Sequence, residues 1–94
     1  MNTRSDEAKQ RVIGLAMEDL AGLSGANKDD IKVLSAEEAT WSSGALGFEE
    51  PGFGYTDAIE DGYKITLSCS GKEYEYHTSM RNVKLDPKIM KRFK

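Results

Sequence analysis

Hydrophobic residues near the start of the chain recur at steps of three and four. The recurring positions are Ala8, Val12, Leu15, Ala16, Leu20 and Leu23. Charged side chains fall mostly on the other side, which is typical of an amphipathic helix with one face on a core. Ser5 is a suitable N-cap, and Gly25 follows the last apolar position, where glycine commonly ends a helix. The pattern predicts a helix over about residues 5–23.

The second half of the chain alternates between hydrophobic and polar residues, which is typical of strands with one buried face. The clearest run covers residues 63–69, where one face is formed by Tyr63, Ile65, Leu67 and Cys69. Ser70 and Gly71 predict a tight turn into a partner strand at residues 72–78. The side chains of that partner divide into two faces, with Tyr74 and Tyr76 on one and Glu73, Glu75 and His77 on the other.

A looser alternation precedes these strands, from Ile31 to Trp41, and we expect an irregularity in it near residues 36–38. A short last strand is expected at residues 82–85. The order of elements predicts an α+β fold, with one N-terminal amphipathic helix packed on a small antiparallel sheet of three to four strands. The chain of 94 residues is expected to form a single domain, with its sheet within about residues 31–85.

The last residues, 86–94, form a basic tail. Asp86 and Pro87 suit the start of a helix, and one face of it would carry Ile89, Met90 and Phe93. Two interpretations are open, and we favour a frayed terminus with solvated charges. The other is a basic amphipathic helix that docks on the acidic half of the chain, on a partner or on an anionic surface.

Charge is distributed unevenly behind a net charge of −3. Residues 29–61 carry nine acidic side chains against Lys32 alone, whereas residues 62–94 carry eight basic side chains against three acidic ones. The acidic majority argues against nucleic acid as the main ligand. The hydrophobic fraction of 38% beside 31% charged residues is that of a globular protein.

The expected cellular location of the protein rests on two features of the sequence, the absence of long apolar runs and the number of cysteines. No run is long enough for a signal peptide or a membrane span. The single cysteine, Cys69, cannot form an intramolecular disulfide. A cytoplasmic protein is therefore expected, and a monomer is the expected oligomeric state.

The stretch from Trp41 to Tyr55 differs from the rest of the chain in its residue types. It holds four glycines, one of the two prolines, the only tryptophan and two of the three phenylalanines. Glycine and proline determine backbone geometry, whereas large aromatic side chains supply buried area or contact surface. We therefore expect a long ordered loop over residues 42–56, after the first strand.

Two interpretations of this loop are open. In the structural one, the loop closes one end of a thin core with Trp41, Gly44, Leu46, Gly47 and Phe48. In the functional one, a rigid tip contacts a protein partner through Glu49, Glu50, Pro51, Gly52, Phe53 and Tyr55. We expect the first half of the loop to be structural and the second half to make the contact.

Candidate chemistry is sparse. His77 is the only histidine, and no nucleophile motif surrounds the nearby serines or Cys69, so we expect an exposed histidine on the sheet and assign no catalytic residue. The acidic run from Glu49 to Asp61 lacks the spacing of a calcium loop. The loop glycines match no phosphate-binding motif either, so no metal or cofactor is assigned.

Three segments together resemble a family of small uncharacterised bacterial and archaeal proteins. The segments are Trp41-x-x-Gly44-x-Leu46-Gly47-x-x-x-Pro51-Gly52-x-x-Tyr55, then Gly62-Tyr63-x-Ile65-x-Leu67, then Gly71-x-x-Tyr74-x-Tyr76-His77-Thr78. The resemblance covers residues 41–85 and supplies no activity. Many members of that family look secreted or lipid-anchored and place cysteine where this chain has Phe48 and near Leu85 or Asp86. The resemblance therefore implies that the loop packs beside the last strand, with an apolar contact in place of a disulfide.

Three hypotheses for function follow. The first is a non-enzymatic binding or regulatory module, for example an inhibitor-like one, that presents loop 42–56 to a protein partner. The second is a small-ligand or catalytic site between loop and sheet, built around Tyr63, Tyr76 and His77. The third is a structural domain without a dedicated site.

Overall fold

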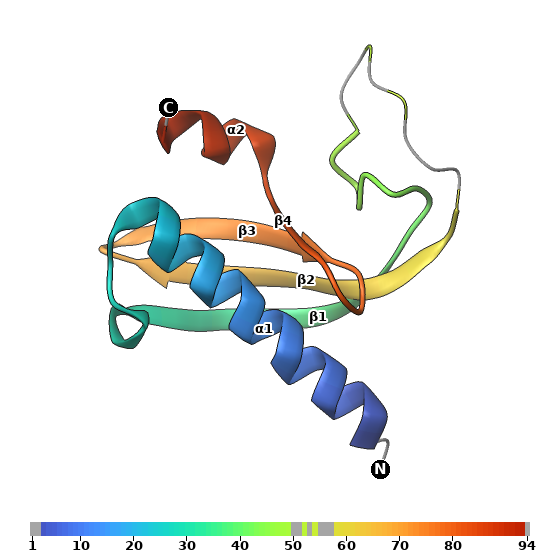
Figure 1. Cartoon of the computed structure of the whole chain (residues 1–94), viewed down its shortest axis with the longest axis horizontal. Coiled ribbons are helices and arrows are strands. Elements are labelled where there is room, and N and C mark those ends of the chain that lie inside the picture. The colour runs from blue at the N-terminus through green and yellow to red at the C-terminus, as the bar shows by residue number, and fades with distance from the viewer. Residues whose placement is uncertain (1–2, 50–51, 53, 55–57, 94) are drawn as a thin grey trace.

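A computed structural model of the chain describes residues 3–49, 52, 54 and 58–93. The elements are α1 (Thr3–Ser24), β1 (Ile31–Trp41), β2 (Glu60–Cys69), β3 (Lys72–Thr78), β4 (Val83–Leu85) and α2 (Pro87–Met90), with short 3-10 turns at Lys28–Asp30 and Lys91–Phe93. Figure 1 shows α1 lying diagonally across one face of an antiparallel sheet with strand order β1-β2-β3-β4. The predicted α+β fold is confirmed.

The core lies between α1 and the sheet. One face of α1 contributes Val12, Ala16 and Leu20, all fully buried, and β2 contributes Ile65 and Leu67. Helix α1 begins at Thr3, so the prediction of Ser5 as its N-cap is wrong. Its end agrees with the sequence: Gly25 adopts a φ of 77° and its N–H donates to the Ala21 carbonyl at 2.9 Å. No helix among the described residues is both long and apolar enough to cross a membrane.

Strand β1 departs from its partner's register once. The pairing shifts between Val33 and Ser35, so Leu34 is the extra residue of a bulge. The predicted irregularity at residues 36–38 was therefore placed too far along the chain. Strand β2 also begins earlier than predicted, at Glu60, because the end of β1 pairs with it as far as Trp41.

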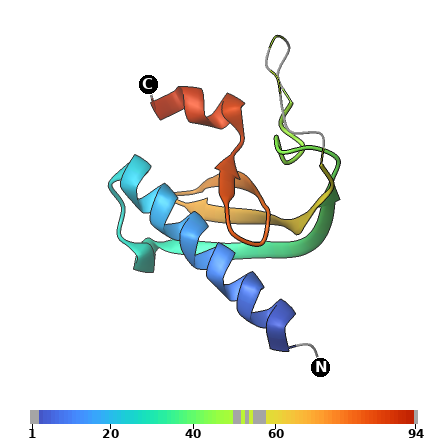
Figure 2. The same ribbon diagram turned by 45° about the vertical axis from the view of Figure 1, so that its right-hand side comes forward.

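The two faces of the sheet differ in character. Alternation places Tyr63, Tyr74 and Tyr76 on the face that α1 covers, where all three are buried. The opposite face is mainly polar and carries Lys32, Ser35, Glu37, Lys64, Thr66, Ser68, Glu73, Glu75 and His77. Figure 2 shows that α1 lies over one face alone. The polar face is the one on which the loop after β1 folds back.

The C-terminal segment is docked on the core. Ile89, Met90 and Phe93 are partly buried against it, and the Phe93 ring lies 6.0 Å from the Tyr74 ring between centroids. The Asp86 carboxylate accepts a hydrogen bond from the Lys88 N–H at 2.9 Å, as a helix cap does. For residues 86–93 the favoured interpretation of a frayed terminus is wrong, because the apolar side chains find a place on the core of the same chain.

Tyr76 joins the sheet to α1 by a polar contact inside the core. Its ring is fully buried, and its hydroxyl donates to the Asp19 carboxylate of α1 at 2.8 Å. Burial raises the pKa of the Tyr76 phenol well above its ordinary value, and the hydrogen bond and negative charge of Asp19 raise it further. The fold therefore stabilises the neutral phenol.

This pKa shift predicts a loss of stability in alkali. Above about pH 10, the ordinary pKa of tyrosine, the unfolded phenol ionises while the folded one stays neutral, so unfolding releases a proton and its free energy falls with rising pH. The expected contribution is at most about 1.4 kcal/mol for each pH unit. Denaturant titrations from about pH 8 to pH 11 on the wild type and on Tyr76→Phe would measure it.

Tyr76→Phe is the control for this effect. At pH 8 it should cost about 1 kcal/mol, because the hydrogen bond to Asp19 is lost. The difference between the two proteins should shrink as the pH rises past 10, because the variant has no phenol to ionise at this position. A difference that stays constant up to pH 11 would contradict the assignment.

Candidate functional site

The base of the loop is held on the sheet by three stacked rings. The His77 ring lies between the Trp41 ring, at 4.2 Å between centroids and 14° between planes, and the Phe48 ring, at 3.7 Å and 11°. We call Trp41, His77 and Phe48 the aromatic clamp. Only 7% of the His77 surface is exposed. The expectation of an exposed histidine is wrong, because residues 42–48 fold back over the polar face of the sheet and cover it.

Both ring nitrogens of His77 meet acceptors. Nδ1 lies 2.5 Å from the Leu46 carbonyl oxygen, and Nε2 lies 2.7 Å from Oε2 of Glu75. The other oxygen of Glu75 lies 3.7 Å from the Lys64 ammonium. A carbonyl can only accept, so Nδ1 donates to it; an ionised Glu75 would likewise require a hydrogen on Nε2. The imidazole is thus engaged at its two faces and at its two nitrogens.

Two consecutive residues with left-handed backbone conformation turn the loop just before Phe48. Leu46 has a φ of 54° and Gly47 a φ of 83°. The Phe48 N–H donates to the Ala45 carbonyl at 3.0 Å and the Ser43 hydroxyl accepts from the Ala45 N–H at 3.2 Å, which closes a compact turn. A Cβ atom on Gly47 would lie 2.7 Å from Cζ3 of Trp41, so glycine is required by space as well as by φ.

Thr78 connects the clamp to the sheet. Its carbonyl accepts the indole N–H of Trp41 at 2.9 Å, and its hydroxyl accepts the Tyr63 N–H at 3.1 Å. The same carbonyl lies against Gly62: a Cβ there would overlap the Thr78 oxygen and lie 2.6 Å from its carbon. Close approach of β2 and β3 at this point therefore depends on the absence of a side chain at Gly62.

The structure places the predicted loop residues in two groups. The predicted structural half is mostly engaged: Leu46 is buried, Trp41 and Phe48 are half-buried in the clamp, and Gly44 and Gly47 are exposed. In the predicted contact half, Glu49 is exposed and its carboxylate accepts from the Ser43 hydroxyl at 3.0 Å, while Gly52 is exposed with a φ of 86°. The remaining members of that half lie outside the described residues, namely Glu50, Pro51, Phe53 and Tyr55.

The residues of the alternative ligand site do not converge. Tyr63 and Tyr76 are 1% and 0% exposed on the face covered by α1, whereas His77 points from the opposite face into the clamp. The alternation along β3 decides this, because neighbouring residues of a strand face opposite sides of the sheet. No single pocket of the described residues brings the three side chains together.

Two of the open pockets formed by the described residues bear on the candidate site. One, of about 430 Å³, lies between the loop and α2 and is lined by Gly47, Phe48, Glu49, Asp86, Pro87, Lys88 and Lys91. Phe48 and Asp86 thus line the same pocket, which brings the loop near the end of the last strand; the apolar contact implied by the resemblance stays a prediction.

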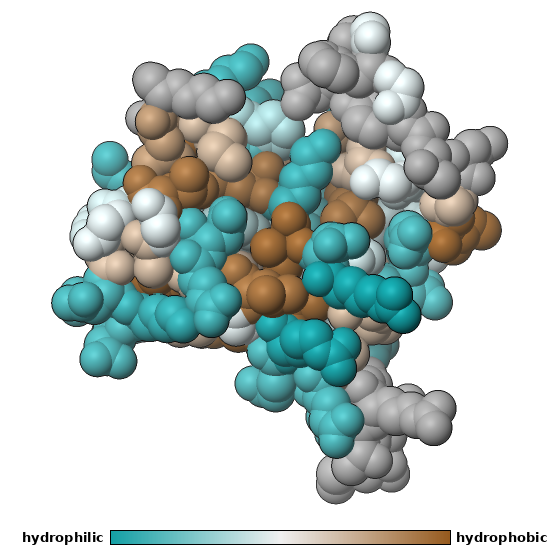
Figure 3. Space-filling model, viewed as in Figure 1, coloured by the Kyte–Doolittle hydropathy of each residue, from teal (hydrophilic) through white to brown (hydrophobic). Residues whose placement is uncertain are grey.

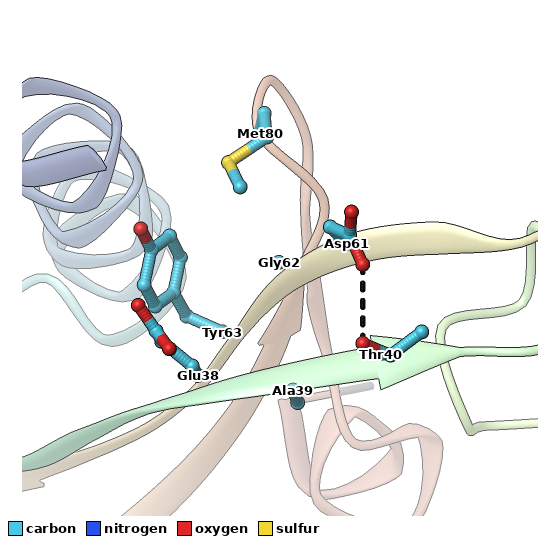
Figure 4. Close-up of a pocket in the computed structure, with 7 residues that line it drawn as sticks. All are labelled: Glu38, Ala39, Thr40, Asp61, Gly62, Tyr63 and Met80. Carbon is cyan, nitrogen blue, oxygen red and sulfur yellow. Dashed lines mark hydrogen bonds between the residues drawn. The ribbon is translucent and has the colours of Figure 1, made fainter. Parts of the chain in front are cut away.

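The other pocket, of about 370 Å³, lies at the ends of β1 and β2 and includes Met80 after β3. Figure 4 shows Glu38 and Tyr63 side by side toward α1, and Asp61 accepting a hydrogen bond from Thr40 at 3.1 Å. The two carboxylates of this pocket, Glu38 and Asp61, thus have different surroundings. The titratable ring in its lining is that of the buried Tyr63. Among the described residues there is also no group of three or more histidine, cysteine, aspartate or glutamate side chains that could hold a metal ion.

The sequence did not reveal the clamp, although it contains every member. Of its members, Trp41 and His77 belong to the three segments of the family resemblance, as do the neighbouring Gly47, Gly62 and Thr78, whereas Phe48 stands at an unspecified position of the first segment. Their joint occurrence was the available signal. Their contacts could not be inferred from it, since Leu46 and His77 alone are 31 residues apart.

Comparison with known proteins identifies a family and no activity. A family model described as a domain of unknown function, DUF8738, matches residues 13–85. Those residues include the greater part of α1, all four strands and the clamp. No curated protein and no solved structure matches the chain.

Proposed function

Since the chain belongs to the DUF8738 family, a domain of unknown function, we propose its function from its own geometry: a non-enzymatic binding module that presents loop 42–56 to a protein partner. The observation that carries the proposal is the aromatic clamp. It fixes the outgoing end of the loop to the sheet through two ring contacts and the Trp41 to Thr78 hydrogen bond. A loop fixed at its base loses less conformational entropy on binding than a slack one.

The returning end of the loop supports the same proposal. Ile59, directly before β2, is 78% exposed, the most of any large hydrophobic side chain among the described residues. Figure 3 shows hydrophobic surface beside the start of β2. A large apolar side chain in this position suits an anchor in a protein interface. Glu49, on the outgoing end, supplies an exposed charge for the rim.

The surroundings of His77 argue against a role as general base in this conformation. A base must reach a substrate proton within hydrogen-bond distance. Both nitrogens of His77 already bind groups of the same chain, and aromatic rings cover both of its faces. The geometry therefore favours an architectural histidine that serves the loop.

The proposal is tested by changing the loop without changing the clamp. We expect the double variant Pro51→Ala/Phe53→Ala, and separately Ile59→Ser, to lose capture of a partner from a lysate of the source cells. The free energy of unfolding of Ile59→Ser should stay within about 0.5 kcal/mol of the wild type, because Ile59 is exposed and surface changes away from packed features have small effects. Capture is measured by quantitative mass spectrometry with the intact chain as bait.

Leu34→Ser is the matched control, because Leu34 is also an exposed large hydrophobic residue but lies on β1 away from the loop. It should leave capture intact. Unchanged capture by the loop variants would contradict the binding proposal. If those variants also lost several kcal/mol of stability, the loop would have a structural role instead.

A further inference from the structure

Strand β1 leaves a long edge of the sheet unpaired. It spans 11 residues and, within the part of the chain that the structure describes, pairs only with β2, whereas the opposite edge, β4, has 3 residues and leads directly into α2. Backbone N–H and C=O groups along the outer side of β1 are therefore available to another strand. A long open edge is a site for strand addition, and the bulge at Leu34 interrupts this edge once.

Two large apolar side chains are exposed on this edge. Val33 is 42% exposed and Leu34 is 54% exposed, on the two sides of the bulge. Val33 pairs with the buried Leu67, so it belongs to the face that α1 covers farther into the sheet. It stays exposed because no strand of the described residues lies beyond β1. An added strand would extend the covered face over Val33.

Helix α1 extends past this edge. Figures 1 and 2 both show α1 crossing β1, with the N-terminal part of the helix projecting beyond the strand. A strand added to β1 would therefore lie below the projecting part of α1. The fold provides a layer above the position of a fifth strand as well as an edge for it.

We propose that β1 pairs antiparallel with β1 of a second copy of this chain, about a two-fold axis at Ser35. Residues that lie opposite each other across the axis must be on the same face of the sheet. Leu34 is the bulged residue, so it is left out when positions are counted from the axis. With the axis at Ser35, Lys32 of each copy lies opposite Glu37 of the other, and Val33 lies opposite Ala36. The two Leu34 side chains come near the axis.

Charge selects this register among the alternatives. An axis at Glu37 or Glu38 would place that carboxylate opposite itself, which is unfavourable for directly opposed strand residues. An axis at Ala36 would place Lys32 opposite Ala39 and leave it without an ionic partner. The axis at Ser35 makes two Lys32–Glu37 pairs by symmetry, because a two-fold contact occurs twice.

The helices favour the same arrangement. A two-fold axis between antiparallel edge strands is perpendicular to the sheet, so both copies of α1 lie on one face. The projecting part of each α1 then passes over the N-terminal half of the other copy's β1, where Val33 is exposed. The dimer is a continuous eight-stranded sheet, twice the four strands of one chain, under two helices. It replaces the monomer expected from the sequence.

The test is the concentration dependence of mass for the full chain by sedimentation equilibrium. The wild type should reach twice the 10.4 kDa chain mass at or below about 1 mM. Leu34→Lys places two charges near the axis and should weaken the dimer at least about tenfold. Met80→Lys changes an exposed apolar residue off this edge and should leave the dimer unchanged.

A charge exchange tests the register. Lys32→Glu and Glu37→Lys should each weaken the dimer about tenfold, because each replaces two attractive pairs by two repulsive ones, and the double variant should recover most of the loss. Circular dichroism confirms that each variant is folded. A wild type that stays monomeric at about 1 mM overturns the proposal. A dimer that is insensitive to Leu34→Lys, or a double variant that is no stronger than the single ones, overturns it as well.

Discussion

Gly62→Ala is expected to lower the free energy of unfolding by about 3 kcal/mol or more, since overpacking against backbone cannot be relieved by a rotamer change. The added Cβ would overlap the Thr78 carbonyl oxygen and lie 2.9 Å from the Ser79 Cα. Relief requires β3 to move away from β2, which would also disturb the Trp41 and Tyr63 hydrogen bonds to Thr78. Domains have only about 5–15 kcal/mol of stability in total, so the loss is a large share.

Chemical denaturation followed by circular dichroism measures this effect, and Gly22→Ala is the matched control. A Cβ on Gly22 meets nothing within 4 Å, and the residue lies inside α1. Alanine there should stabilise the protein by about 0.5–1 kcal/mol, because it is the better helix former. If Gly62→Ala alone does not fold, the pair of substitutions supplies a more stable background. A change below about 1 kcal/mol at Gly62 would contradict the close approach of the two strands.

His77→Ala is expected to release the base of the loop at a cost of about 2–4 kcal/mol, the range for losing a buried ring and its hydrogen bonds. Both stacking contacts disappear, and the Leu46 carbonyl and the Glu75 carboxylate lose their shared partner. Hydrogen exchange should therefore speed up in residues 42–49 far more than in α1. Trp41 emission should also shift to the red, since one face of the indole becomes exposed.

Ser68→Ala is the control on the same face of the sheet, because it truncates a half-buried side chain outside the clamp. Its effect should stay within about 0.5 kcal/mol. Unchanged hydrogen exchange in residues 42–49 of His77→Ala would contradict the clamp.

Gly47→Ala disturbs the clamp from the loop side and gives an independent measurement. Gly71→Ala is its counterpart, since the two glycines have similar φ values of 83° and 78° but only Gly47 has Trp41 within contact distance. Both variants should pay about 1–2 kcal/mol for the left-handed backbone. Gly47→Ala should lose more stability than Gly71→Ala, because its added Cβ also overlaps the Trp41 ring. Only Gly47→Ala should speed up hydrogen exchange in the loop.

Local periodicity predicted the elements well. The apolar spacing of α1 and the alternation of β2 and β3 follow from geometry within single elements, because a helix or strand must turn its hydrophobic residues to one side. Element ends were less accurate, and pairing explains it. Glu60 joins β2 because Trp41 is opposite it, and the bulge lies at Leu34 because of the register with Leu67 and Thr66.

The candidate site could be predicted only in its composition. Trp41, Phe48 and the glycines between them indicated a built loop, and the resemblance placed His77 and Thr78 in the same pattern. The alternation of polar and apolar residues along β3 also indicated that His77 lies on the polar face of the sheet. An exposed His77 side chain was the reasonable expectation from that position. A face is covered or open according to what other segments do, and here residues 42–48 cover it.

The sequence by itself therefore determined the helix, the strands, the apolar face that each turns to the core, and the presence of an unusual loop. Tertiary structure alone decided that His77 is buried between two rings, that Tyr63 and Tyr76 lie on the other side of the sheet, and that the C-terminal segment docks on the core. The reason is physical. Periodicity is a property of neighbours along the chain, whereas burial depends on which distant segments meet, and that is decided by packing of the whole fold.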